Sequence, residues 1–321
     1  MAGQLFVWKP TPKAPPLLMY ARDGESLYDA TERYEHAVNG QFDLESLKAE
    51  SGVPYFDFEG RELPLAHGVA SGAGPRLLLI GNLLDDLFAR PKGDRILDFV
   101  DVFAALGLTP LVLPVTHDAG LSAVDIADYH EALATHVAGV LAVGGPDVAP
   151  KLYREPNTDA VDPNHARDRS ELRVLTALAT EPDLPVIGIC RGAQLLAISR
   201  GYQLVQEIHK EVAGAVGHKD GWHEVLFPRD CWLGRTLDTT HAVVRSFHHE
   251  AVDPSSATTL RITATSSDGV VEAYESKDER LLGFQFHPEL MPTTEGRLIM
   301  QGIATHVLAA AARPRSLPGH H

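Results

Sequence analysis

Short apolar runs recur through the middle of the chain and alternate with stretches of helical periodicity. The runs at 77–80, 111–113, 140–143 and 186–189 contain no charged residue, as expected for strands that are buried on both faces of a sheet. Between the first two runs, apolar residues recur at helical spacing over 96–106. Because strands that alternate with helices form parallel βαβ units, the pattern predicts an α/β fold: a doubly wound, mostly parallel sheet flanked by helices.

A further helix is predicted from Asp168 onwards. Glu171 follows Asp168 by three residues, which resembles a capping box, and leucines at 172, 175 and 178 share one helical face. We therefore expect this helix to begin at Asp168.

The C-terminal third has a different texture, because strand-like segments follow one another without long helical stretches between them. Five such segments are predicted, at 224–227, 242–245, 260–265, 270–274 and 282–286. A last helix, roughly at 295–311, is predicted to close the fold.

The first 75 residues differ from the rest of the chain. Four prolines before residue 17 favour extended or turn structure, residues 25–37 are predicted to form a short polar helix, and residues 71–75 are typical of a linker. We therefore predict three parts: an N-terminal extension of unknown role at 1–75, a main domain at 76–312 and a flexible tail at 313–321.

Composition and charge exclude several classes of function. Apolar residues make up 44% of the 321 residues, enough for a substantial core. The formal net charge is −15 and no basic run offsets it, which excludes nucleic acid as the expected partner. No apolar run is long enough to span a bilayer, and residues 1–4 lack the layout of a secretory signal. Two cysteines rule out a disulfide framework and fit a reducing compartment, so a cytoplasmic protein is predicted.

The predicted strand at 186–189 leads directly into Cys190, which has a glycine two residues away on each side, Gly188 and Gly192. This arrangement is typical of a nucleophile elbow, a tight strand-to-helix turn at which a side chain would crowd either glycine position. The positive end of the helix dipole stabilises a thiolate there, and backbone N–H groups at the helix start can bind an oxyanion. The alternative is an inert core cysteine; the paired glycines favour a nucleophile.

A thiolate nucleophile needs a base and a group that orients the base. His287 comes just after a predicted strand, and Glu289 lies two residues further on. In an extended segment these two side chains point the same way, so Glu289 can bond one imidazole nitrogen while the other faces Cys190. Taken alone, the pair would be a surface histidine beside a solvated glutamate.

Together these motifs resemble the class I glutamine amidotransferase-like superfamily, which combines a Gly-x-Cys-x-Gly elbow with a late His-Pro-Glu. Within it the sequence is most similar to the γ-glutamyl-γ-aminobutyrate hydrolase family. The glycine-rich stretch 144–148, Arg167-Asp168 and the segment 246–249 also match, and the similarity covers roughly residues 76–310 in order and spacing. The main domain is therefore expected to be a glutamine amidotransferase-like hydrolase domain.

The resemblance implies a mechanism for hydrolysis of a γ-glutamyl amide. Cys190 would attack the δ-carbonyl, His287 would protonate the departing amine, and water would release glutamate from the thioester. The backbone N–H groups of Gly145 and Arg191 would form the oxyanion hole. Five residues match positions that bind the glutamyl part of the substrate: Gly144, Gln194, Ser246, Phe247 and His248. No cofactor and no metal is implied.

Two departures from the family pattern leave the released amine open. The family usually has Asn-Ser-x-His-His-Gln, whereas this chain has arginine at 245 and glutamate at 250. The family's Gly-Gly after the nucleophile helix is Gly201-Tyr202 here.

Three other functions are alternatives to this hypothesis: a metal enzyme, a glutaminase subunit and a non-catalytic binding protein. The 16 histidines, among them His209, His218 and His223 and the run 248–250, raise the question of a metal enzyme, but no recognised ligand spacing is present. A glutaminase subunit that delivers ammonia to a separate synthetase would use the same three residues. A non-catalytic binding protein would have no need of them. The sequence leaves open whether the chain forms a homo-oligomer and whether it has a synthetase partner. Cys231 is predicted to be structural.

Overall fold

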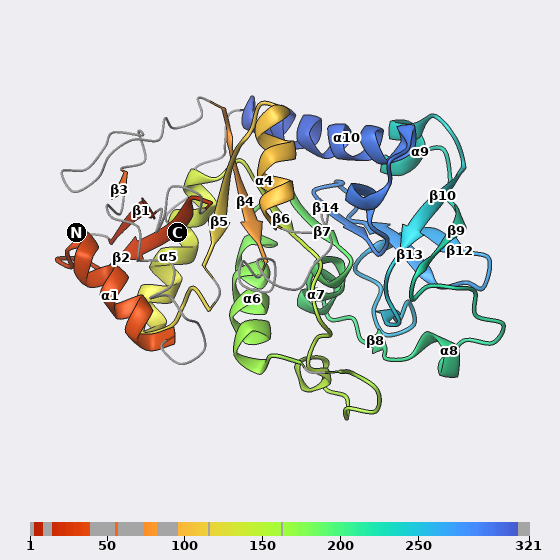
Figure 1. The fold of residues 1–321 in the computed structure, drawn as a ribbon, viewed down its shortest axis with the longest axis horizontal. Helices are drawn as coiled ribbons and strands as arrows, with labels where there is room; N and C mark the ends of the chain where they lie inside the picture. The colour runs from red at the N-terminus through yellow and green to blue at the C-terminus, as the bar shows by residue number, and fades with distance from the viewer. Residues whose placement is uncertain are drawn as a thin grey trace. The chain divides into compact units, whose positions relative to one another are not determined.

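The computed structural model describes most of the chain in two compact units, Met1–Val137 and Ala138–His321 (Figure 1). The described residues are 3–8, 15–38, 55–56, 74–81, 96–114, 116–161 and 163–313. Residues 9–14 and 71–73 and the predicted tail beyond residue 313 lie outside them. The predicted division at residues 75 and 312 stays a prediction.

The described part of the first unit contains five strands in the order β4-β5-β2-β1-β3. The strands are β1 (Gln4–Trp8), β2 (Leu17–Ala21), β3 (Tyr55–Phe56), β4 (Arg76–Ile80) and β5 (Thr109–Leu113). The helices among the described residues of this unit are α1 (Leu27–Val38), α4 (Ile96–Ala105) and α5 (Ala123–His136). β4, β5 and β2 run parallel, whereas β1 pairs antiparallel with β2 and β3. The segment before residue 76 therefore supplies strands to this sheet, and α1 confirms the predicted polar helix.

The described sheet of the second unit has the strand order β10-β9-β12-β13-β14-β7-β6. Its last three strands are parallel to one another, and the first four are antiparallel to their neighbours. The parallel strands are β6 (Gly139–Ala142), β7 (Val186–Ile189) and β14 (Leu281–Phe284). The antiparallel strands are β9 (Gly221–Leu226), β10 (His241–Ser246), β12 (Arg261–Ser266) and β13 (Val271–Glu275). β8 (Leu204–Val205) and β11 (Ala251–Val252) form a separate pair.

Five helices and two 3₁₀ turns complete the described part of the second unit. The helices are α6 (His165–Leu178), α7 (Arg191–Ser199), α8 (Ile208–Glu211), α9 (Trp232–Leu237) and α10 (Thr294–Ala311). The 3₁₀ turns are η1 (Pro150–Tyr153) and η2 (Pro288–Leu290).

The predicted fold class, an α/β fold with a mostly parallel central sheet flanked by helices, is confirmed. Each apolar run noted in the sequence forms a parallel strand, because a strand covered on both faces needs apolar side chains on both. The five strand-like segments of the C-terminal third form β9, β10, β12, β13 and β14, and the last helix is α10.

Helices α7 and α10 lie on opposite sides of the parallel strands of the second unit (Figure 1). Glycines allow both contacts to be close. A Cβ on Gly192 of α7 would lie 2.0 Å from the carbonyl oxygen of Ala142 in β6, and one on Gly188 of β7 would lie 2.5 Å from the backbone nitrogen of Ala193. On the other side, Gly139 of β6 packs against Val307 of α10.

The predicted capping box at Asp168 is wrong. Helix α6 begins three residues earlier, because the side chain of Asn164 accepts a hydrogen bond from the backbone N–H of Arg167 and so caps the helix. Asp168 and Glu171 are buried on the inner side of α6. Among the described residues, no helix is long and apolar enough to cross a membrane.

Candidate active site

Cys190 occupies a strained backbone conformation between β7 and α7. Its φ is 51° and its ψ is −114°, a combination that residues with a side chain rarely adopt. Its N–H donates to the carbonyl oxygen of Phe284 at 2.7 Å, so the neighbouring strand β14 holds the turn in place. The side chain is nearly buried, with 6% of the residue exposed.

His287 and Glu289 follow the end of β14 and form a buried pair. Nδ1 of His287 lies 2.6 Å from Oε1 of Glu289. Burial alone would lower the pKa of His287, but the charges of Cys190 and Glu289 and hydrogen bonds to both raise that pKa well above its usual value. The geometry therefore favours an imidazolium at His287, held between Cys190 and Glu289.

The two expected oxyanion-hole residues lie against each other. Arg191 is the first residue of α7, where backbone N–H groups have no partner within the helix. Gly145 lies in the turn after β6, and a Cβ at this position would be 2.7 Å from Cδ of Arg191. A glycine is therefore needed for the turn to approach the elbow this closely.

A buried ionic network fixes the elbow to helix α6. The guanidinium of Arg191 pairs with Asp168 at 2.5 Å and also with Glu171, which pairs with Arg167 at 2.6 Å. Asp168 in addition accepts a hydrogen bond from the backbone N–H of Ala149 at 3.0 Å. The network thus joins α6, the start of α7 and the loop after β6.

We expect Glu171→Gln to destabilise the protein by about 3 kcal/mol at pH 7, because it removes the carboxylate shared by two buried guanidinium groups. Burial opposes ionisation, but Arg167 and Arg191 lower the pKa of Glu171 from 4.5 to about 2. A lowered folded-state pKa stabilises the fold above the unfolded pKa, so the difference between variant and wild type should shrink as the pH falls from 4.5 towards 2.

Urea unfolding between pH 3 and pH 8 measures this difference. Glu224→Gln, at an exposed position of β9, is the matched control and should change stability by less than about 0.5 kcal/mol. Equal stability of the Glu171 and Glu224 variants would contradict a stabilising role for the network.

A cavity of about 180 Å³ opens beside Cys190. Its lining includes five of the predicted site residues: Gly145, Cys190, Gln194, Phe247 and His248. It also includes Asp147, His249 and Glu250, which lie in segments compared with the family but were given no role in the site, and Lys219, which the sequence did not single out. These four come from loops, where no periodic pattern marks which side chains turn inward.

Two of the predicted substrate-binding residues, Ser246 and Gly144, are not among the residues that line the cavity. The hydroxyl of Ser246 is buried and donates to the carbonyl oxygen of His218 at 2.7 Å. Gly144 is buried in the turn before Gly145. Direct contact of either residue with substrate stays a prediction.

Glu250 stands where the resembling family has glutamine. Burial and the charges of Asp147 and Asp168 raise its pKa to about 9, although Arg191 opposes the shift. A protonated carboxylic acid offers one O–H donor beside a carbonyl acceptor, as an amide offers N–H donors beside one. At neutral pH the departure from the family pattern therefore keeps the hydrogen-bonding character of the position.

Comparisons with known proteins identify the family of the chain. The model of the family Peptidase C26 matches residues 90–289. YvdE of Lactococcus lactis, described as a glutamine amidotransferase-like protein, is 33% identical over 204 residues, which cover 61% of this chain and 81% of that protein. NtpR of Enterococcus hirae is 34% identical over 60% of this chain and 80% of its own length.

Solved structures share the fold at low sequence identity. The glutaminase domain of Trypanosoma brucei CTPS, solved with bound acivicin, has a TM-score of 0.54 at 17% identity and covers 76% of this chain and 96% of its own. A glutamine amido transferase from Methylobacillus flagellatus has a TM-score of 0.51 at 17% identity, over 77% of this chain and 98% of its own. The family match over more than half of the chain shows that this protein belongs to the Peptidase C26 family, within the class I glutamine amidotransferase-like superfamily.

Proposed function

We propose that this protein hydrolyses the γ-amide bond of a small γ-glutamyl compound and releases glutamate and an amine. Membership of Peptidase C26 implies a hydrolase or amidotransferase activity. The observation that carries the finer proposal is the buried chain of contacts from Cys190 through His287 to Glu289 at the wall of a small cavity.

The first half of the reaction forms a thioester. The Cys190 thiolate attacks the δ-carbonyl carbon, and the backbone N–H groups of Gly145 and Arg191 stabilise the oxyanion. The imidazolium of His287 gives its proton to the amine as the C–N bond breaks. Glu289 holds the imidazole in the orientation and tautomer that this transfer requires.

The second half restores the enzyme. His287, now neutral, takes a proton from water as the water attacks the thioester carbon, and the C–S bond breaks to regenerate the Cys190 thiolate. The histidine ends protonated, as it began. Water is the only co-substrate that the balance requires, and no nucleotide takes part.

The charges around the cavity suit an amino-acid head group. Lys219 offers a cation for an α-carboxylate, and Asp147 offers an anion for an α-ammonium. Nε2 of Gln194 lies 3.3 Å from the carbonyl oxygen of Glu250 and leaves the amide oxygen as a further acceptor. A cavity of about 180 Å³ fits a substrate of this size better than a protein chain.

Purified protein should release glutamate from at least one member of a panel of γ-glutamyl amides without nucleotide or a second protein. The panel should contain glutamine, γ-glutamyl-γ-aminobutyrate, a γ-glutamyl polyamine and γ-glutamyl amino acids, with α-glutamyl isomers as controls. Enzymatic assay of free glutamate, at equal substrate concentration, ranks the leaving amines. Cleavage of the α-isomers alone would contradict the proposed position of the scissile bond.

A glutaminase subunit is the second candidate. GMP synthase of Streptococcus pneumoniae is 28% identical over 54% of this chain but only 28% of its own length. On that proposal the panel gives no glutamate until a synthetase and its substrates are added, and glutamine is then the only substrate. This outcome would replace independent hydrolysis with ammonia delivery.

A further inference from the structure

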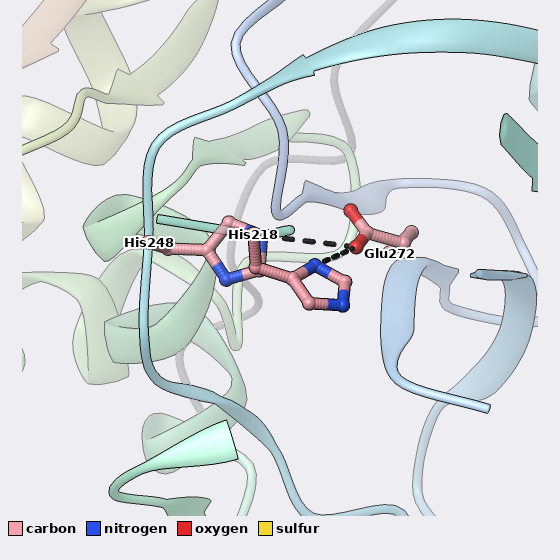
Figure 2. Close-up of side chains that lie close together, drawn as sticks. All are labelled: His218, His248 and Glu272. Atoms are coloured by element: carbon pink, nitrogen blue, oxygen red, sulfur yellow. Dashed lines mark ion pairs between the residues drawn. The ribbon is translucent and has the colours of Figure 1, made fainter. Parts of the chain in front are cut away.

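Beside the cavity, a second set of buried polar side chains meets at one carboxylate. His218 precedes β9, His248 follows β10, and Glu272 lies in β13. Nδ1 of His218 is 3.1 Å and Nε2 of His248 is 3.7 Å from the same oxygen, Oε1 of Glu272. Figure 2 shows both imidazole rings directed at this oxygen. All three side chains are at least nine-tenths buried.

The outer nitrogen of each ring faces a group that can only accept a hydrogen bond. Nε2 of His218 lies 3.0 Å from a carboxylate oxygen of Asp268, and Nδ1 of His248 lies 2.9 Å from the backbone carbonyl oxygen of Glu250. While both imidazoles are neutral, each carries one proton, and these contacts place that proton on the outer nitrogen. The inner nitrogens then present lone pairs towards Glu272.

Lone pairs on neutral rings repel the buried carboxylate that they face unless a proton or a metal ion lies between them. Nδ1 of His218, Nε2 of His248 and Oε2 of Glu272 are buried and have no hydrogen-bond partner among the described residues. His223 also contacts the carboxylate, with its Nε2 2.9 Å from Oε1. Unpartnered buried polar atoms are costly, and a metal ion bound to Glu272 would satisfy both inner nitrogens at once.

The spacing of the three ligand groups suits a small divalent ion. Their ligand atoms lie within 4.8 Å of one another. A tetrahedral ion with bonds of about 2.0–2.1 Å sets its ligands about 3.3 Å apart, a value between the two distances from Glu272 to the histidines. Two imidazoles and one carboxylate suit Zn²⁺ and its first-row neighbours, whereas Ca²⁺ and Mg²⁺ prefer oxygen ligands.

We propose that His218, His248 and Glu272 bind a divalent first-row transition-metal ion, best suited to Zn²⁺, at a site separate from the Cys190 chemistry. Asp268 and His223 would be the outer partners that orient His218 and Glu272. His248 also lines the cavity. The ion would therefore fix the segment 246–250 against β13 and position the wall of the cavity, without entering the reaction.

The proposal is tested by metal binding in the Cys190→Ala protein, which removes the only thiol at the cavity and makes the test independent of the proposed function. After chelation and gel filtration, this variant should take up about one Zn²⁺ per chain, and titration with Co²⁺ should produce the visible absorption of a tetrahedral N/O site. Zn²⁺ should also raise the midpoint of thermal unfolding by about 5 °C or more.

In the same background, His218→Gln and Glu272→Gln should each lower zinc uptake at least tenfold. His241→Gln replaces an exposed histidine of β10 and should leave uptake unchanged. If either ligand variant fails to fold, the Co²⁺ spectrum and zinc stoichiometry of the parent protein decide. No uptake by the parent at micromolar zinc, or full uptake by a folded His218→Gln protein, would overturn the proposal.

Discussion

Cys190→Ala should lower kcat for glutamate release by at least about 10³-fold, because no other group on the cavity wall can form the thioester. Cys231→Ala should retain most of the activity. Cys231 is fully buried at the start of α9, where its sulfur accepts a hydrogen bond from the N–H of Gly234 at 3.3 Å. Burial also raises the pKa of the Cys231 thiol, which favours the unreactive form.

Covalent labelling separates the two cysteines directly. An electrophilic analogue of glutamine should modify the wild-type chain once, at Cys190, and block turnover in proportion to the label. Peptide mass spectrometry identifies the site. Equal loss of activity in both cysteine variants, or labelling of Cys231, would mean that the nucleophile has been assigned to the wrong residue.

Gly192→Ala should cost more than about 5 kcal/mol of stability, or prevent folding altogether. The new Cβ would lie 2.0 Å from the carbonyl oxygen and 2.4 Å from the carbonyl carbon of Ala142, which are backbone atoms of β6. A clash with backbone cannot be relieved by a rotamer change, so α7 would have to move away from the sheet. Because α7 starts at the elbow, any protein that does fold should lose activity as well.

Gly217→Ala is the matched control for this prediction. No heavy atom lies within 4 Å of a Cβ built at Gly217, and its φ is not in the left-handed region. We expect this variant to unfold within about 0.5 kcal/mol of wild type. Urea unfolding of both variants, followed by circular dichroism, measures the difference. Similar stabilities for the two would show that β6 and α7 are not packed as closely as described.

The sequence predicted the parts of the fold that are governed by local pattern. Apolar runs identified the parallel strands, since only strands covered on both faces lack polar residues. The spacing of Gly188, Cys190 and Gly192 identified the elbow for a similar reason, because a tight turn between strand and helix leaves no room for side chains. The strands β1 and β2 were not predicted, since the nearby prolines favour extended or turn structure without specifying a sheet, and the pairing of β2 with β5 is a long-range contact.

The ionic network and the histidine cluster could not be predicted in the same way. Asp168 and Glu171 have the spacing of a helix cap, and only the tertiary contact with Arg191 explains their burial. His218, His248 and Glu272 are separated by tens of residues and come from different loops and strands. Metal sites are recognised in sequences by close ligand spacing, which a site assembled from distant segments does not have.

The pairing of β7 with β14 has a consequence for how the distance from nucleophile to base is controlled. Ile189, just before Cys190, is paired in register with Phe284, three residues before His287. The sheet therefore serves as the spacer between the two groups. Loops between α7 and β13 that do not line the cavity can change in length without altering that spacing. A slip of one residue in the β7–β14 pairing would instead displace the imidazole by about 3.3 Å and turn alternate side chains to the opposite face. The pairing of β7 with β14 thus makes the site tolerant of insertions in those loops and intolerant of a change in the register of the two strands.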